Sequence, residues 1–205
     1  YLLTVGYLIT KYPYSSTKKN IINHINTWAI FLEFLIIFYQ ASRGVQSHYN
    51  MASSFDAILF LLMGVFVGIT VLVMVLFIFD TVRLKLNTSK SMQWAILLGW
   101  IIIFFGSWVG GQMISQVSHS VGVADGGAGL PLVNWSTKGG DLRIAHFFAL
   151  HGLQILPLFA LWVSKKSNFS NKKQLLSVTI FALLFAALIG YVFFQAKQGI
   201  PVIAL

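Results

Sequence analysis

Long apolar runs with very few charges alternate with short polar segments along this chain. Five runs are complete, at residues 25–42, 56–79, 94–115, 142–163 and 175–195. Each is long enough to cross the hydrocarbon core of a bilayer as a helix. Residues 1–10 are also apolar but too few to cross alone, so we interpret them as a partial span or an interfacial piece. The pattern predicts an all-α transmembrane bundle of five complete spans plus a partial N-terminal one.

The composition supports a single transmembrane domain over residues 1–205. Hydrophobic residues make up 57% of the chain and charged residues 9%, whereas roughly a quarter of a soluble domain is charged. The chain has no cysteine, which excludes disulfides, thiolate metal sites and iron–sulfur clusters. The net charge of +9 does not indicate nucleic-acid binding, because the basic residues lie in short loops between apolar runs.

The distribution of these basic residues predicts an orientation. The loops at residues 11–20, 80–92 and 164–173 hold ten of the 14 Lys and Arg residues. By the positive-inside rule these loops are cytoplasmic, and loops 43–55 and 116–141 are periplasmic or extracellular. We therefore expect a polytopic protein of the bacterial cytoplasmic (inner) membrane. Its expected partners are the lipid bilayer and other membrane subunits.

The long outer loop at residues 116–141 is rich in glycine, with six glycines. Loops of this length are commonly functional or disordered. Its scattered Val, Leu and Trp residues provide apolar anchors, so we expect it to fold back over the outer mouth of the bundle. Asp141 stands where an N-cap would begin the fourth complete span.

Two histidines follow within that fourth span. His146 and His151 are five residues apart, or about 140° around a helix, so they cannot chelate one ion as a pair spaced by four does. We expect one imidazole to meet a cofactor, ion or substrate and the other to join a supporting network with Arg143 and Gln154. The alternative is that both histidines only hydrogen-bond neighbouring helices and hold the bundle together.

Further polar residues are predicted on the same outer side, and we expect them to converge at one mouth. The metal or haem candidates are His48, His119, His146, His151 and Asp125. The supporting polar candidates are Asn50, Asp141, Arg143 and Gln154. Imidazole and carboxylate without thiolate suit a divalent metal ion or haem b. A stripe of Gly99, Gly106 and Gly110 could offer haem a flat gap, although such stripes also serve helix packing.

Glu33 is a separate candidate, near the middle of the first complete span. An ionised carboxylate is expensive at that depth, so Glu33 is a candidate proton relay. The alternative is a neutral acid bonded to Thr70, Ser107 or Tyr191. Pro157 lacks the amide hydrogen that would bond the Leu153 carbonyl, which predicts a kink in the fourth span below His151.

Three segments together resemble a pattern found in uncharacterised polytopic membrane proteins of bacteria. They are SHYN after the first complete span, HSVGVADGGAGLP in the long loop, and GGDLRIAHFFALH at the start of the fourth span. The resemblance covers residues 43–157. It implies that the outer-face segments form one unit, and it assigns no role to any residue.

Three functions remain open from the sequence. The leading expectation is a metal ion or haem bound at the outward-facing polar site, serving redox chemistry or a small membrane enzyme. The second is a proton-coupled transporter that uses Glu33 and the histidines. The third is an accessory subunit of a larger membrane complex.

Overall fold

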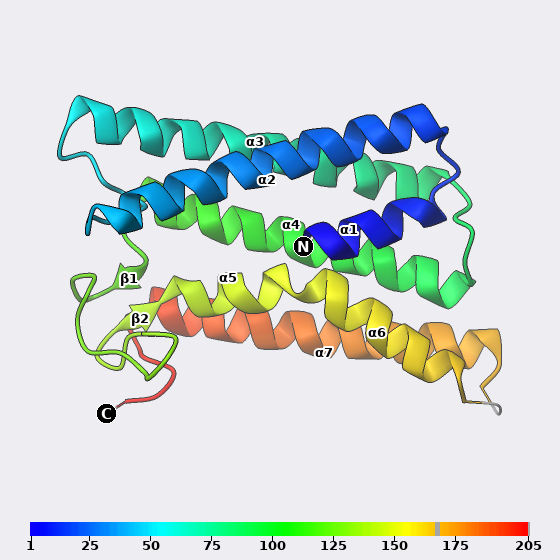
Figure 1. Cartoon of the computed structure of the whole chain (residues 1–205). Helices are drawn as coiled ribbons and strands as arrows, with labels where there is room; N and C mark the ends of the chain where they lie inside the picture. Colours follow the sequence, from blue (N-terminus) through cyan, green and yellow to red (C-terminus); the bar gives the residue numbers. More distant parts are fainter. Residues whose placement is uncertain (167–168, 205) are drawn as a thin grey trace. The chain divides into compact units, whose positions relative to one another are not determined.

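A computed structural model describes residues 1–166 and 169–204, and 70% of the chain is helical (Figure 1). Residues 167–168, within the basic loop predicted at 164–173, lie outside the described residues. Four described helices are long and apolar enough to cross a membrane, and a bent pair of helices makes a fifth if it is one span. The chain divides into two compact units, Tyr1–Thr88 and Ser89–Leu205, which are described in turn.

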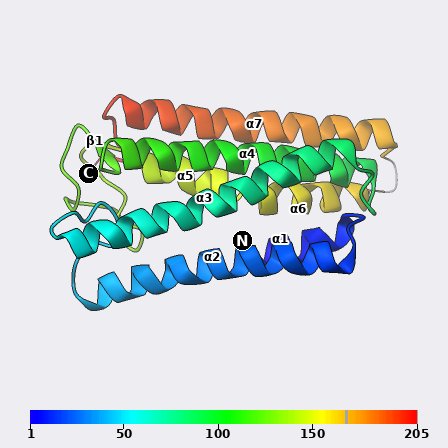
Figure 2. The same cartoon turned by 90° about the horizontal axis from the view of Figure 1, so that it is seen from above.

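The first unit is a long helical hairpin preceded by a short helix. Its elements are α1 (Leu2–Leu8), the 3-10 turn η1 (Ile9–Lys11), α2 (Ser16–Ser42) and α3 (Ser54–Arg83). Serines begin both long helices, because the side chains of Ser15 and Ser53 accept hydrogen bonds from backbone amides in the first turn. α2 and α3 run side by side in opposite directions (Figures 1 and 2).

An ion pair lies at each end of this hairpin. Arg43 follows α2 and contacts Asp56 in the first turn of α3 at 2.6 Å. At the other end, Lys18 contacts Asp80 at 3.0 Å, and the Tyr14 hydroxyl donates to the same carboxylate at 2.7 Å. Both carboxylates are buried, so the two pairs fix the register of α2 against α3.

The second unit is a helical bundle with a small two-stranded sheet at one end. Its elements are α4 (Lys90–Ser115), β1 (Ser120–Val121), β2 (Gly140–Asp141), α5 (Leu142–Leu150), α6 (Gly152–Ser164) and α7 (Asn171–Lys197). α4 packs against α5, α6 and α7, and α7 also contacts α5 and α6. The sheet joins the segment after α4 to the start of α5.

The glycine stripe of α4 is the surface against which α5 and α6 pack. A Cβ atom at Gly106 would lie 2.8 Å from the Cβ of Ala149, and one at Gly99 would lie 3.0 Å from the Cα of Leu153. Gly152 reciprocates, because a Cβ there would lie 2.7 Å from Ile102. Small residues thus bring the helices into backbone contact, and α5 and α6 fill the gap that the sequence suggested for a flat ligand.

α5 and α6 meet at an angle of 45°. The kink expected in this span is present, but it lies at His151, which ends α5 with φ −86° and ψ −1°. Pro157 lies inside α6 instead of at the bend. The prediction placed the kink too far along the chain because it considered only the proline. The bend occurs beside Gly152, a poor helix former that packs closely against Ile102 of α4.

Candidate functional site

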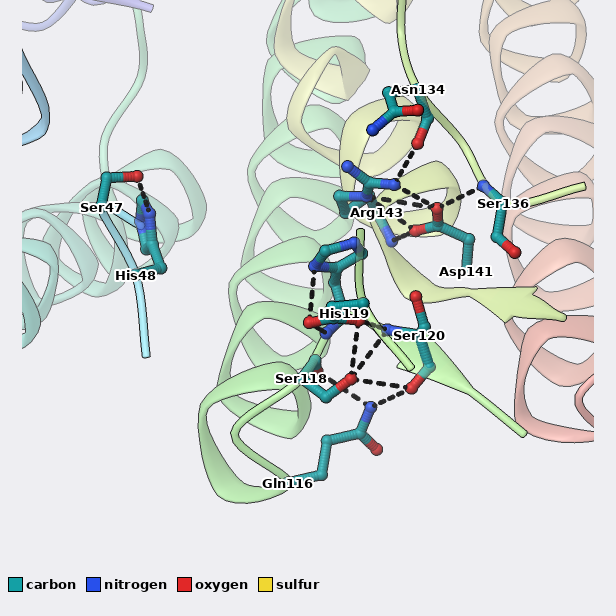
Figure 3. A network of polar contacts seen from close by, with 11 residues as sticks. Ser47, His48, Gln116, Ser118, His119, Ser120, Asn134, Ser136, Asp141 and Arg143 are labelled. Atoms are coloured by element: carbon teal, nitrogen blue, oxygen red, sulfur yellow. Dashed lines mark hydrogen bonds and ion pairs between the residues drawn. The ribbon is translucent and has the colours of Figure 1, made fainter. Parts of the chain in front are cut away.

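The most extensive polar network of the second unit lies at the end where α4 stops and α5 begins (Figure 3). β1 pairs with β2 so that Ser120 lies opposite Asp141. The Leu142 amide donates to the His119 carbonyl at 3.0 Å, which extends the pairing by one residue. Backbone bonds therefore place His119 beside the first turn of α5.

Asp125 is one centre of this network. Its carboxylate accepts hydrogen bonds from the Ser118 hydroxyl at 2.8 Å and from the amides of Ser120 and His119 at 2.9 and 3.1 Å. Burial alone would raise the pKa of this carboxyl, but these hydrogen bonds outweigh it and lower the pKa below its ordinary value. Asp125 is therefore an ionised acceptor at neutral pH.

His119 is oriented by that carboxylate. Its Nδ1 lies 3.0 Å from the Asp125 Oδ2, and an ionised carboxylate can only accept, so Nδ1 carries the proton. The other ring nitrogen, Nε2, then has a free lone pair in the neutral imidazole. Burial first, and then the nearby positive charge of Arg143, lower the pKa of His119, while Asp125 and Asp141 oppose this. The ring is therefore neutral at pH 7, and its side chain is 19% exposed.

Asp141 is the second centre, and it is 1% exposed. Its side chain accepts from the Arg143 amide at 3.0 Å, which confirms the predicted N-cap of the helix that follows. It also accepts from the Ser136 amide at 2.9 Å and pairs with the Arg143 guanidinium at 2.6 Å. Asp141 thus ties the long loop to the start of α5.

Arg143 connects the two centres. Its guanidinium donates to the Asn134 carbonyl as well as to Asp141, and its charge acts on the His119 ring. Its side chain remains 30% exposed. The sequence placed Arg143 in a supporting network, and in the described structure it holds the loop and presents positive charge close to an imidazole.

The two histidines of the fourth span lie in different surroundings. His146 Nδ1 is 2.8 Å from the Gly106 carbonyl oxygen and so links α5 to α4. His151 is exposed, and its Nδ1 is 2.7 Å from the carbonyl of Phe147, one turn earlier in the same helix. Gln154, which was expected to support the two histidines, is half-buried. Its backbone N–H donates to the His151 carbonyl.

The remaining outer-side candidates belong to the first unit. His48 Nδ1 lies 2.9 Å from the Ser47 hydroxyl, and the side chain of Asn50 accepts from the Ala52 amide. The shared mouth expected for His48 and His119 therefore stays a prediction. Across residues 1–166 and 169–204, no three His, Asp or Glu side chains are arranged to hold one metal ion.

Glu33 is half-buried in the middle of α2. Thr70, one of the partners considered for it, instead donates its hydroxyl to the Val67 carbonyl. Within the part of the first unit that the structure describes, Glu33 forms no hydrogen bond or ion pair.

Several buried polar residues of the first unit were not among the predicted site residues. They are Asn26, Gln40, Asp56 and Asp80. The two aspartates lie at the ends of an apolar run, where charged residues commonly mark only the boundary of a span. The two amides carry no charge, and their seven-residue spacing from Glu33 is the signal in the sequence that points to them.

The chain was also compared with known proteins. No protein-family model, curated protein or solved structure matches it.

Proposed function

We propose that this chain is an integral protein of the bacterial cytoplasmic membrane with five complete spans and a partial N-terminal one. The four long apolar helices support this, together with the bent pair α5 and α6 counted as one span. The charge distribution supports cytoplasmic basic loops, which puts the loop at 116–141 on the outer side. Lipid and other membrane subunits are its proposed partners.

The proposed role of the second unit is to bind a metal ion or haem iron through His119, for redox chemistry or a membrane enzyme. The observation that carries this proposal is the 3.0 Å contact between His119 Nδ1 and Asp125 Oδ2. Imidazoles that bind metals almost always donate their other N–H to a carboxylate, carbonyl or water, which fixes the tautomer and raises ligand basicity. His119 has this arrangement, and its lowered pKa keeps Nε2 unprotonated at neutral pH.

The surroundings of His119 favour haem iron over a closed structural ion. A structural zinc site uses four protein ligands, and the described residues gather no group of three. Haem iron already has four nitrogen ligands from the porphyrin and needs only one or two axial protein ligands. Arg143, partly exposed beside His119, offers a cation suited to a haem propionate or to another anionic group.

The test is an absorption spectrum and elemental analysis of the purified full chain. We expect a Soret band or a stoichiometric metal that disappears in His119→Ala. Asp125→Asn should weaken binding by about 10–100-fold, as expected for loss of an outer carboxylate. His151→Ala is the matched control, because it also removes an imidazole from the second unit, and His151 is exposed and lies outside the network of Asp125 and Asp141. A wild-type protein with neither haem nor metal after supplementation would refute the proposal.

A further inference from the structure

Three polar side chains repeat every seven residues along α2. They are Asn26, Glu33 and Gln40. Seven residues advance a helix by almost two full turns, so the three lie on one face, about 10.5 Å apart at 1.5 Å per residue. Buried Ile22 and Ala29 occupy the alternating positions of the same stripe. Along this stripe of α2, apolar residues therefore alternate with polar ones.

The two amides on this face are buried with polar atoms unpaired. Asn26 is 1% exposed, and neither its Nδ2 nor its Oδ1 has a hydrogen-bond partner in the described structure. The Tyr1 hydroxyl lies near it and is also without a partner in hydrogen-bond geometry. Gln40 is 0% exposed; its Oε1 accepts from Arg43, but its Nε2 meets no acceptor in hydrogen-bond geometry, although Asp56 is close.

The nearest protein groups, the Tyr1 hydroxyl and the Asp56 carboxylate, do not meet these atoms in hydrogen-bond geometry, which leaves ordered water as their partner. Buried polar groups are paired in nearly all proteins, and ordered water pairs those that no protein atom reaches. A chain of water molecules would also bridge the intervals between Asn26, Glu33 and Gln40, which are too long for direct contact.

Glu33 is the titratable group midway along this face. α3, which packs against α2, has no titratable side chain between Asp56 and Asp80, and α1 contributes only Tyr7. At its two ends the hairpin carries the charged clusters described above, Arg43 with Asp56 and Lys18 with Asp80 and Tyr14. A carboxyl group at membrane depth is inexpensive when protonated and can exchange its proton with water beside it.

We propose that the face of α2 formed by Asn26, Glu33 and Gln40 is a hydrated path that carries protons across the membrane. Glu33 accepts a proton from water on one side and releases it to water on the other, so one proton crosses in each cycle. The path lies wholly within the first unit and does not use His119, so it is independent of the metal or haem proposed for the second unit.

The experiment is proton flux into vesicles that contain the purified full chain. A potassium gradient with valinomycin sets the membrane potential, and a trapped pH-sensitive dye reports the internal pH. We expect flux well above that of protein-free vesicles, and we expect Glu33→Gln to reduce it to the protein-free level. Glu33→Asp, which keeps the carboxyl group, should retain part of the flux. Wild-type flux equal to that of empty vesicles would overturn the proposal without reference to any variant.

Two further variants separate a path from a merely structural role. Asn26→Leu and Gln40→Leu remove the polar groups that hold water, so we expect loss of flux in both. Thermal stability should be unchanged or raised in Asn26→Leu, whereas Gln40→Leu also loses the hydrogen bond from Arg43 and should be less stable. Undiminished flux in both, or in Glu33→Gln, would refute the proposal. His119→Ala is the matched control: it should keep full flux while losing the metal or haem, so the two proposals fail independently.

Discussion

A Cβ atom at Gly140 would lie 1.9 Å from the carbonyl oxygen of Ala196. β2 therefore lies directly on the last turn of α7, and only glycine leaves room for this contact. Because Gly140 precedes Asp141 and pairs with Val121, the same contact positions both carboxylate centres of the candidate site. The absence of a side chain at one position thus supports the whole network.

Gly140→Ala should displace β2 from α7 and disturb the site. We expect a loss of at least about 1–3 kcal/mol of stability, the usual cost of overpacking, together with loss of any ligand held by His119. Thermal unfolding in detergent and the absorption spectrum measure the two effects. Gly111→Ala is the control, because nothing lies within 4 Å of a Cβ there and alanine favours the helix. Equal stability of the two variants would contradict the contact.

Gly106→Ala should separate α4 from α5. The new methyl group would meet the Cβ of Ala149 at 2.8 Å and the Leu150 amide nitrogen at 3.3 Å. We expect a loss of about 1–3 kcal/mol, measured by thermal unfolding. Gly64→Ala in α3 is the comparison, since a Cβ there meets nothing within 4 Å. Similar losses in both variants would mean that the glycine face of α4 does not carry close packing.

Tyr14→Phe should weaken one end of the α2–α3 hairpin. The variant removes the hydroxyl that donates to Asp80 at 2.7 Å but keeps the ring that stacks on Tyr12. A lost hydrogen bond to a charged group costs about 1.5–3 kcal/mol, so unfolding should begin at a lower temperature. Tyr39→Phe is the matched control. Combining Tyr14→Phe with Lys18→Met tests whether the two donors act on the same carboxylate, in which case their effects will not add.

Acidification should destabilise the second unit in two stages. Burial and the charge of Arg143 lower the pKa of His119 below 6.5, so below that pH the unfolded chain binds more protons than the folded one and stability falls. Burial would raise the pKa of Asp125, but its hydrogen bonds hold it below 3.8, so its contribution is present above that pH and is lost as pH falls through the lowered value. Unfolding temperatures measured between pH 8 and pH 3 test this.

His119→Gln isolates the first of these stages. The variant cannot take up a proton, so its stability should vary less between pH 6.5 and the lowered pKa of the histidine. The decline at lower pH, which arises from Asp125, should persist. An unchanged slope in the upper range would show that another group titrates there.

The sequence predicted the helices well because lipid-crossing segments must be long and apolar. The predicted run at 94–115 and the observed α4, Lys90–Ser115, end at the same residue. The largest error is at the start of α2. The helix begins at Ser16, whereas the predicted apolar run begins at residue 25. Polar residues also form helix there, and the cap at Ser15 was a signal available in the sequence.

The candidate site was less predictable because its geometry depends on irregular backbone. Asp141 could be assigned as a cap from its position before an apolar run. The pairing of His119 with Asp125 could not be predicted in this way. Here the chain turns back through Val117 and Gly122, which have positive φ angles of 52° and 82°. Turns of this kind depend on contacts with distant residues, such as Gly199 beside Gly122, and a short window of sequence does not contain them.

The bend at His151 divides the fourth apolar run into two helices that are held by different contacts. α5 is held at its first turn by the strand pairing and by Arg143. The first turn of α6 is held against α4 instead, by the close approaches of Gly152 to Ile102 and of Leu153 to Gly99. A substitution that loosens α6 from α4 therefore leaves the contacts that anchor the His119 network in place.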